Sequence, residues 1–501
     1  MGLMGVDGFL VKVEADLSQG LPGFDVVGLP GAAVRESRDR VRSSMKNCGF
    51  DYPVSRITVN LAPADVRKEG SVYDLPLLLA LLRAGGQLNA SLDGYAFLGE
   101  LSLTGDIRPV KGALPMVIAA RDGGMRRVFV PAANAAEAAV TDGIEVYAAG
   151  NVPELLDHLT GRGELPRAVA PKAYAPAAST AEDFADVRGQ ASARRALEVA
   201  AAGAHNILLI GPPGSGKSML AKRLPSILPD MTREEALEVT KIHSVAGTLP
   251  GGGLLRSRPF RAPHHNISAP GLTGGGSLPR PGEVSLAHQG VLFLDELPEF
   301  SRQSMEALRQ PLEERRVTIS RVNATLSYPC SFMLAAAMNP CPCGYFGHPA
   351  RACTCTPKAA RQYLARVSGP LLDRIDLHIE VPPVEYDKLA DDTPAESSAE
   401  IRRRVNAARL RQQERLKGAG ITANAQIPPG LLRRVCPLTP AAQTLLKSAF
   451  DRLGLSARAY DRLLKVARTI ADLDGADTLD SAHIAEAVQY RSLDRKYWEK
   501  G

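Results

Sequence analysis

Apolar residues recur along the chain first in short alternating runs and later with helical spacing. The runs before residue 160 are rich in β-branched residues and bounded by turn residues, so they predict strands. They lie at 9–14, 23–27, 55–61 and 127–131. Helical spacing at 32–48 and 75–83 separates them. The pattern predicts an α/β domain over residues 1–165.

A change of composition separates this part from the rest. Residues 166–182 are rich in Pro and Ala without periodicity, which predicts a linker. Continuous apolar runs, typical of buried strands, mark residues 183–385, whereas helical spacing marks residues 386–501. We therefore expect a second α/β domain followed by a helical domain.

The apolar run at 206–210 leads into a glycine-rich loop and then into a helical pattern. Such a loop turns backbone N–H groups and a helix N-terminus toward phosphates, while a lysine neutralises their oxygens and a hydroxyl can ligate Mg²⁺. The stretch is a Walker A motif and predicts ATP and Mg²⁺ as cofactors. The predicted binding residues are Gly211, Pro212, Pro213, Gly214, Ser215, Gly216, Lys217 and Ser218.

Two further apolar runs end in polar residues of matching chemistry. The run at 290–294 ends in Asp295, predicted to hold Mg²⁺ through its water shell, and Glu296, predicted to polarise the attacking water. The run at 332–338 ends in Asn339, an amide that can orient the same water. Together with Walker A, these residues predict nucleotide hydrolysis.

Two arginines, Arg374 and Arg458, follow helix-breaking or small-residue turns. On spacing alone, each is either a solvated surface group or part of the site. The order of these motifs resembles an AAA+ ATPase. That resemblance implies that Arg374 is a finger inserted into a neighbouring subunit's ATP site, and that Arg458, from a helical lid, touches the γ-phosphate of its own site. It also places Val187, Gly189 and Gln190 beside adenine.

An arginine acting in trans implies a ring, and the resemblance makes a homo-hexamer the usual state. The long segment between Walker A and Walker B is similar to the helix-2 insertion of the magnesium-chelatase and MCM-helicase clade. Alternation over 316–328 predicts a β-hairpin before sensor 1. In that clade a basic residue near the hairpin tip contacts DNA phosphates, which makes Arg321 the candidate. The alternative is a solvent-exposed hairpin arginine.

Four cysteines follow sensor 1 as two Cys-x-Cys units: Cys341, Cys343, Cys353 and Cys355. Four thiolates can close a tetrahedral Zn²⁺ site, in which His348 could replace one of them. The alternative is a set of free thiols in a disordered or redox-sensitive loop. We expect a brace or a substrate-facing element here, because hydrolysis is accounted for by other residues.

The stretch 103–131 resembles the proteolytic domain of Lon, which implies a ribosomal-protein-S5-like α/β fold. Where Lon has its nucleophilic serine this chain has Val72, and where Lon has its lysine it has Met116. Neither side chain can serve as nucleophile or base, so we expect a scaffold without peptidase activity. A shifted dyad of Ser71 and Lys111 is the alternative.

The whole order of domains, with the phrases at 33–42, 261–265 and 368–378, is identified as that of the YifB/ComM family. Membership implies a hexameric DNA helicase that promotes branch migration during integration of transforming DNA. The second interpretation is a chelatase-like motor subunit that remodels a metal-inserting partner protein, and the third is a peptidase.

Charge and hydropathy change this picture little. The formal net charge of +6 permits DNA contact without requiring it. The longest apolar run, 75–82, is far shorter than the roughly 20 residues that cross a bilayer. The N-terminus carries neither a basic region nor a cleavable apolar segment. We expect a soluble cytoplasmic protein with no membrane partner.

Overall fold

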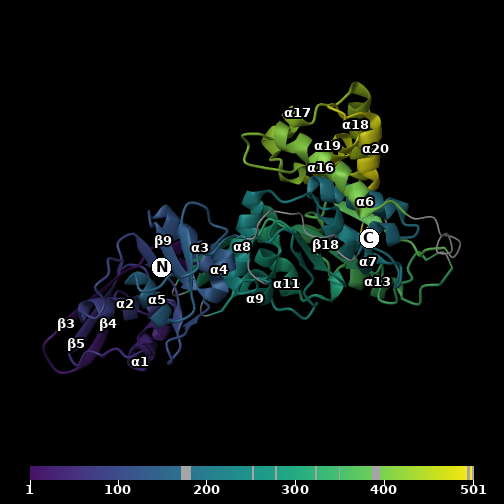
Figure 1. The fold of residues 1–501 in the computed structure, drawn as a ribbon. Coiled ribbons are helices and arrows are strands. Elements are labelled where there is room, and N and C mark those ends of the chain that lie inside the picture. Colours follow the sequence, from purple (N-terminus) through teal and green to yellow (C-terminus); the bar gives the residue numbers. More distant parts are fainter. Residues whose placement is uncertain are drawn as a thin grey trace. The chain divides into compact units, whose positions relative to one another are not determined.

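The computed structural model divides into two compact units (Figure 1). The N-terminal unit comprises Met1–Tyr174 and Arg233–Leu255, and the second unit comprises Ala175–Thr232 and Arg256–Gly501. The structure describes residues 1–170, 182–250, 253–276, 279–321, 324–348, 350–385, 395–493 and 497–498. Most of the expected linker, residues 171–181, lies outside the described residues.

The N-terminal unit contains two three-stranded sheets. In one, β5 (Arg56–Ala62) lies between β3 (Lys12–Ser18) and β4 (Gly23–Val27). The other, which is parallel, has the order β10 (Glu145–Ala149), β9 (Arg127–Pro131), β6 (Tyr95–Phe97). Alternate residues of β5 are fully buried, as period-two alternation requires of a half-buried strand.

Helices of the N-terminal unit include α1 (Ala32–Asn47), α2 (Asp74–Ala84), α3 (Ala113–Asp122) and α5 (Val152–Leu159). The apolar face of α2 is buried, and its sequence is a nearly continuous leucine run. Another helix, α8 (Arg233–Ala246), follows Walker A in sequence but belongs to this unit. Gly112 N donates to Ser244 O at 3.0 Å and so ties α8 to the start of α3.

The second unit is built on a five-stranded parallel sheet. Its order is β12 (Phe260–Arg261), β15 (Val291–Leu294), β18 (Met333–Met338), β11 (Ile207–Ile210), β19 (Leu377–Glu380). Every residue of β11, β15 and β18 is buried, which explains why these strands are continuous apolar runs. Since the strands are parallel, the loops that follow them meet at one edge of the sheet.

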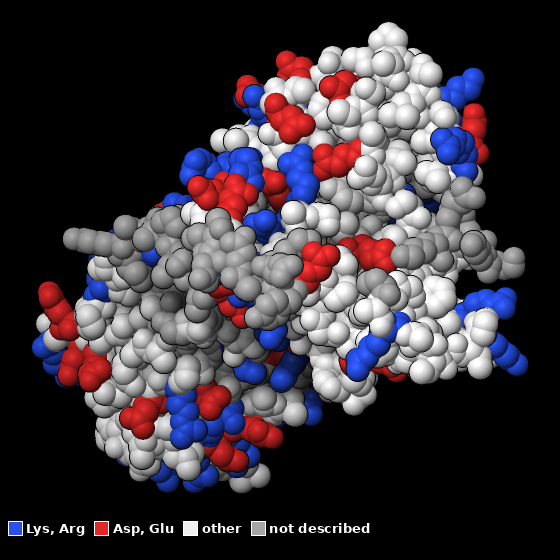
Figure 2. All heavy atoms as spheres, turned by 90° about the vertical axis from the view of Figure 1, so that its right-hand side faces the viewer, with Lys and Arg blue, Asp and Glu red and all other residues white. Residues whose placement is uncertain are grey.

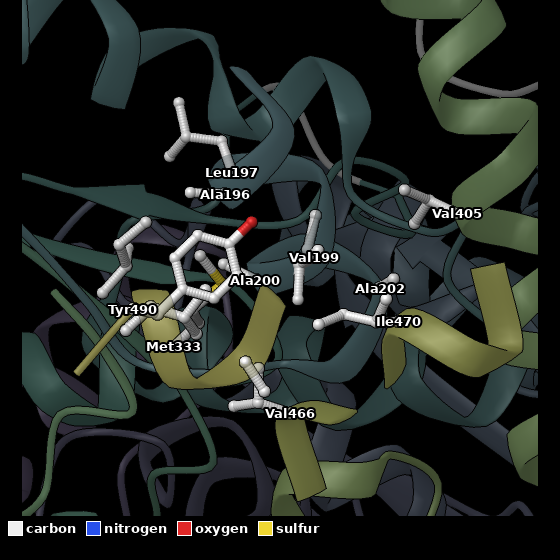
Figure 3. Packing of buried hydrophobic residues seen from close by; sticks show 14 of the residues in the cluster. Ala196, Leu197, Val199, Ala200, Ala202, Met333, Val405, Val466, Ile470 and Tyr490 are labelled. Carbon is white, nitrogen blue, oxygen red and sulfur yellow. The ribbon is translucent and has the colours of Figure 1, made fainter. Parts of the chain in front are cut away.

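The C-terminal region is helical, as predicted, and shares a hydrophobic core with the sheet domain. Its longer helices are α16 (Ser398–Arg415), α18 (Pro440–Leu453), α19 (Ala457–Leu473) and α20 (Ser481–Gln489). Of these, α16 and α19 pack on α6 (Ala191–Gly203), where Val199 and Ala202 face Val405 and Ile470 (Figure 3). The helical region therefore packs directly on α6, the helix that precedes β11.

No helix among the described residues combines the length and the apolar character that crossing a bilayer requires.

Candidate nucleotide-binding site

The phosphate loop, between β11 and α7 (Lys217–Ile227), brings Lys217 to the edge of the sheet. Its Nζ donates to the carbonyl oxygens of Gly211 and Pro212, each at 2.8 Å, and to Asn339 Oδ1 at 3.2 Å. Asn339 directly follows β18, the strand beside β11. The Walker A lysine and the sensor-1 amide are therefore in contact.

The two residues predicted to bind Mg²⁺ also come together. Ser218, on the first turn of α7, donates from Oγ to Asp295 Oδ2 at 2.6 Å. Asp295 directly follows β15, so its carboxylate and the serine hydroxyl lie at one sheet edge. A hydroxyl and a carboxylate are the hard oxygen ligands that Mg²⁺ takes beside nucleotide phosphates. Ser218 and Asp295 would hold it here.

The loop leaves room for phosphates, and buried polar atoms without a partner lie beside it. Gly214 and Gly216 adopt φ of 77° and 90°, and a Cβ placed on Gly214 would meet no atom within 4 Å. Ser215 Oγ and Gln190 Oε1 are buried and have no hydrogen-bond partner within the described part of the chain. These features fit a bound nucleotide, because buried polar atoms normally find a partner.

Burial lowers the pKa of Lys217 from 10.5 to about 8, although Asp295 and Glu296 act in the opposite direction. The amine is hidden among backbone carbonyls, and desolvation disfavours its charged form. A triphosphate would supply the missing negative charge.

Glu296 has a backbone φ of 52°, a left-handed conformation that is uncommon for residues other than glycine. Its carboxylate is exposed and lies with Oε2 3.5 Å from His265 Nδ1. The sequence patterns did not single out His265 as a site residue. Only the fold brings the segment after β12 to the end of β15, so spacing along the chain gave no signal for this pair.

Of the three residues expected beside adenine, Gln190 is joined to the phosphate loop. Its Nε2 donates to Ser215 O at 3.2 Å and to Pro382 O at 2.6 Å. Gly189 precedes it with φ of 63°, whereas Val187 is wholly buried in the hydrophobic core. Gln190 thus links the segment before α6 to the site.

The two arginines lie on separate elements, and within the described part of the chain neither contacts Lys217. Arg374 follows α14 (Gly369–Leu372), is 8% exposed, and donates to Glu313 and to Pro370 O of the same chain. Arg458 is exposed on the first turn of α19. One chain therefore holds its expected finger against its own Glu313.

The hairpin before sensor 1 consists of β16 (Arg316–Arg321) and β17 (Ala324–Pro329), paired antiparallel. Ile319 is buried, and Tyr328 OH donates to Pro279 O at 2.7 Å, which anchors the base of the hairpin. Arg321 ends β16 opposite Ala324, but its side chain lies outside the part of the structure that is described.

The four cysteines come together, with their Sγ atoms within 4.8 Å of one another. His348 does not join them: its Nδ1 accepts backbone N–H groups of Ala350 and Arg351, each at 3.0 Å.

Comparison with known proteins agrees with this geometry. Family models match over three segments: magnesium chelatase subunit ChlI over 183–389, subunit ChlI of Mg-chelatase over 13–134, and the ChlI C-terminal region over 395–491. YifB of Escherichia coli is 46% identical over 98% of this chain and 96% of its own length. Competence protein ComM of Haemophilus influenzae is 46% identical with the same coverage.

The chain belongs to the YifB/ComM family of magnesium-chelatase-like ATPases. Rv2897c of Mycobacterium tuberculosis is also similar, at 45% identity over 98% of this chain and 97% of its own. Family membership and the assembled Walker residues together indicate ATP hydrolysis with Mg²⁺.

A weaker similarity connects part of this YifB/ComM chain with Lon protease of Mycolicibacterium smegmatis, at 25% identity over 31% of the chain. At the positions expected to correspond to the Lon dyad, Val72 and Met116 are buried in the core. Ser71 Oγ donates to Glu100, whereas the Lys111 side chain lies beside Gly247. The structure thus pairs Ser71 with a carboxylate rather than with a lysine.

Proposed function

We propose that this protein is a ring-forming AAA+ ATPase that couples ATP hydrolysis to translocation on DNA, and that it acts as a ComM-type branch-migration helicase in the integration of transforming DNA or in recombination. The observation that carries the proposal is the meeting of Lys217, Ser218, Asp295 and Asn339 at one sheet edge. The 46% identity to a competence protein supports the DNA substrate.

Each residue has a defined task in this scheme. Lys217 and the loop N–H groups bind the phosphates, and Ser218 with Asp295 holds Mg²⁺, which neutralises charge on the phosphoryl group. Glu296 accepts a proton from the attacking water, and Asn339 orients that water. Gln190 lines the nucleoside side of the pocket, and Arg458 extends from the lid toward the γ-phosphate.

Arg374 acts on the neighbouring chain's nucleotide, and six chains close the ring. Its pairing with Glu313 inside one chain supports this role, because a guanidinium held by an exposed carboxylate can exchange that partner for a phosphate. An arginine supplied in this way accelerates phosphoryl transfer by roughly 10³–10⁵.

DNA contact is assigned to Arg321 at the hairpin end. On the face in Figure 2, Lys and Arg side chains are interspersed with Asp and Glu, so that face offers no broad basic field among its described residues. Binding of DNA phosphates then depends on individual basic residues around the ring rather than on a broad basic surface.

The decisive experiment compares Arg321→Ala with Arg316→Ala, an exposed arginine at the far end of the same strand. We expect forked DNA to stimulate the ATPase of the wild type and of Arg316→Ala but to stimulate Arg321→Ala only weakly. Each lost phosphate contact should also make binding less salt-dependent. An ATPase rate that stays the same with DNA of every geometry would contradict the proposal.

A chelatase-like motor subunit is the second candidate, favoured by the three ChlI family models. In that case the ring would remodel a metal-inserting partner protein. Recovery of such a partner in a pull-down, without any shift of forked DNA, would place this candidate first.

We further propose that the N-terminal unit is a Lon-like scaffold without peptidase chemistry. A serine-reactive probe should leave Ser71 unlabelled, and labelling there would contradict this.

A further inference from the structure

The cysteine cluster has the dimensions of a tetrathiolate metal site. Sγ of Cys341 lies 3.4 Å from that of Cys343 and 3.7 Å from that of Cys353, and Cys343 and Cys353 are 3.5 Å apart. Four sulfur atoms about 2.3 Å from a central Zn²⁺ form a tetrahedron with edges of about 3.8 Å. Cys355 completes the group and accepts the backbone N–H of Cys343 at 3.3 Å, as sulfur ligands often do.

The loop that carries these cysteines is held by turns and side-chain contacts rather than by regular secondary structure. Between β18 and α13 (Pro357–Leu364), the described residues contain no helix or strand. A metal that joins its two ends would replace the missing backbone ladder, because the binding free energy of a structural zinc is folding free energy.

The same loop contacts the nucleotide site at two points. Asn339, two residues before Cys341, accepts a hydrogen bond from Lys217. Gly344, with φ of 83°, lies so close to the phosphate loop that a Cβ on it would be 2.4 Å from Cδ of Pro213. The loop that holds the cysteine cluster therefore contacts both the Walker A lysine and the phosphate loop.

We propose that Cys341, Cys343, Cys353 and Cys355 bind one Zn²⁺ as thiolates, and that this metal holds the phosphate loop in place through the contact between Gly344 and Pro213. Binding releases the thiol protons to solvent. The metal is structural, because four protein ligands leave no open position for water or substrate.

The metal itself is tested by elemental analysis of the full chain. Wild-type protein and Cys48→Ser, which removes a cysteine outside the cluster, should each contain one zinc per chain. The double variant Cys353→Ser, Cys355→Ser should lose it. Less than a tenth of an equivalent of zinc in the wild type, iron in its place, or cluster disulfides found by mass spectrometry would overturn the proposal.

The coupling is tested by Gly344→Ala, which retains every cysteine but places a methyl group against Pro213. We expect zinc to stay bound and the Kd of a fluorescent ATP analogue to rise about tenfold, the equivalent of one charge-assisted hydrogen bond from the loop. Gly418→Ala is the matched control, because Gly418 has a similar φ of 82° with no atom within 4 Å of an added Cβ.

Unchanged ATP affinity in Gly344→Ala would refute the coupling even where zinc is present. The measurement on Gly344→Ala remains decisive even if the double cysteine variant fails to fold. A zinc-free protein that still hydrolyses ATP on DNA would refute the metal site and leave the proposed motor intact.

Discussion

At the scale of the residue, the site is defined by what surrounds Lys217. Its ammonium group lies among two backbone carbonyls and the amide oxygen of Asn339, and burial lowers its pKa to about 8. Below that pH the amine is charged in the free protein and ready for phosphate. Above it, a proton must be taken up when the nucleotide binds, because the phosphates favour the charged form.

This predicts a pH-dependent affinity. From pH 7 to 8 the affinity for ATP should change little, and above pH 8 it should fall by up to tenfold per pH unit. Binding of a fluorescent ATP analogue between pH 7 and 9.5 measures the slope. Lys222→Ala, on the exposed side of α7, should keep the same profile. A flat profile in the wild type up to pH 9.5 would contradict the effect of burial on Lys217.

At the scale of the element, continuous apolar runs were sufficient to place the central strands, because β11, β15 and β18 are buried on both faces. The helices expected at 32–48 and 75–83 are present within one residue of α1 and α2. The strand expected at 9–14 lies later, as β3, because the chain first forms a small antiparallel pair, β1 (Gly2–Met4) and β2 (Asp7–Phe9), around Gly5 with φ of 65°.

Part of the site was accessible to sequence reasoning and part was not. Walker A and the cysteine cluster depend on short spacings, which a sequence displays directly. The contact of His265 with Glu296 depends on strand order instead. Asn206 is a similar case. Its Oδ1 accepts a hydrogen bond from Leu334 N at 2.8 Å, and its Nδ2 donates to Arg374 O at 2.8 Å. Asn206 thus joins β18 to the segment that carries Arg374.

The packing of the helical region on α6 gives a prediction about stability. Ile470 is 1% exposed on α19 (Figure 3), so Ile470→Ala should lower the free energy of unfolding of the second unit by about 2–5 kcal/mol. Leu410→Ala, on α16 at 66% exposure, should change it by less than about 0.5 kcal/mol. Urea unfolding followed by circular dichroism compares them. Equal stability of the two variants would contradict the shared core.

At the scale of the whole molecule, the proposed mechanism requires more than one chain. Within a single chain Arg374 contacts Glu313, and in the proposed ring the pocket of each protomer would receive its finger from the neighbouring chain. Ring closure would then exchange a carboxylate for a phosphate, and hydrolysis in one protomer would depend on the protomer beside it. Homo-oligomers of this head-to-tail kind close into rings when the rotation between chains permits it.

The most direct test mixes two variants, each defective in a different half of the interface. Glu296→Gln retains its finger and ATP binding but should lose roughly 10²–10⁴ in hydrolysis rate. Arg374→Ala retains its pocket but should lose roughly 10³–10⁵. In an equal mixture, about a quarter of the interfaces join an intact pocket to an intact finger. We predict that DNA-stimulated ATPase recovers toward a quarter of the wild-type rate, whereas a mixture no faster than the average of the two separate variants would contradict an arginine acting in trans.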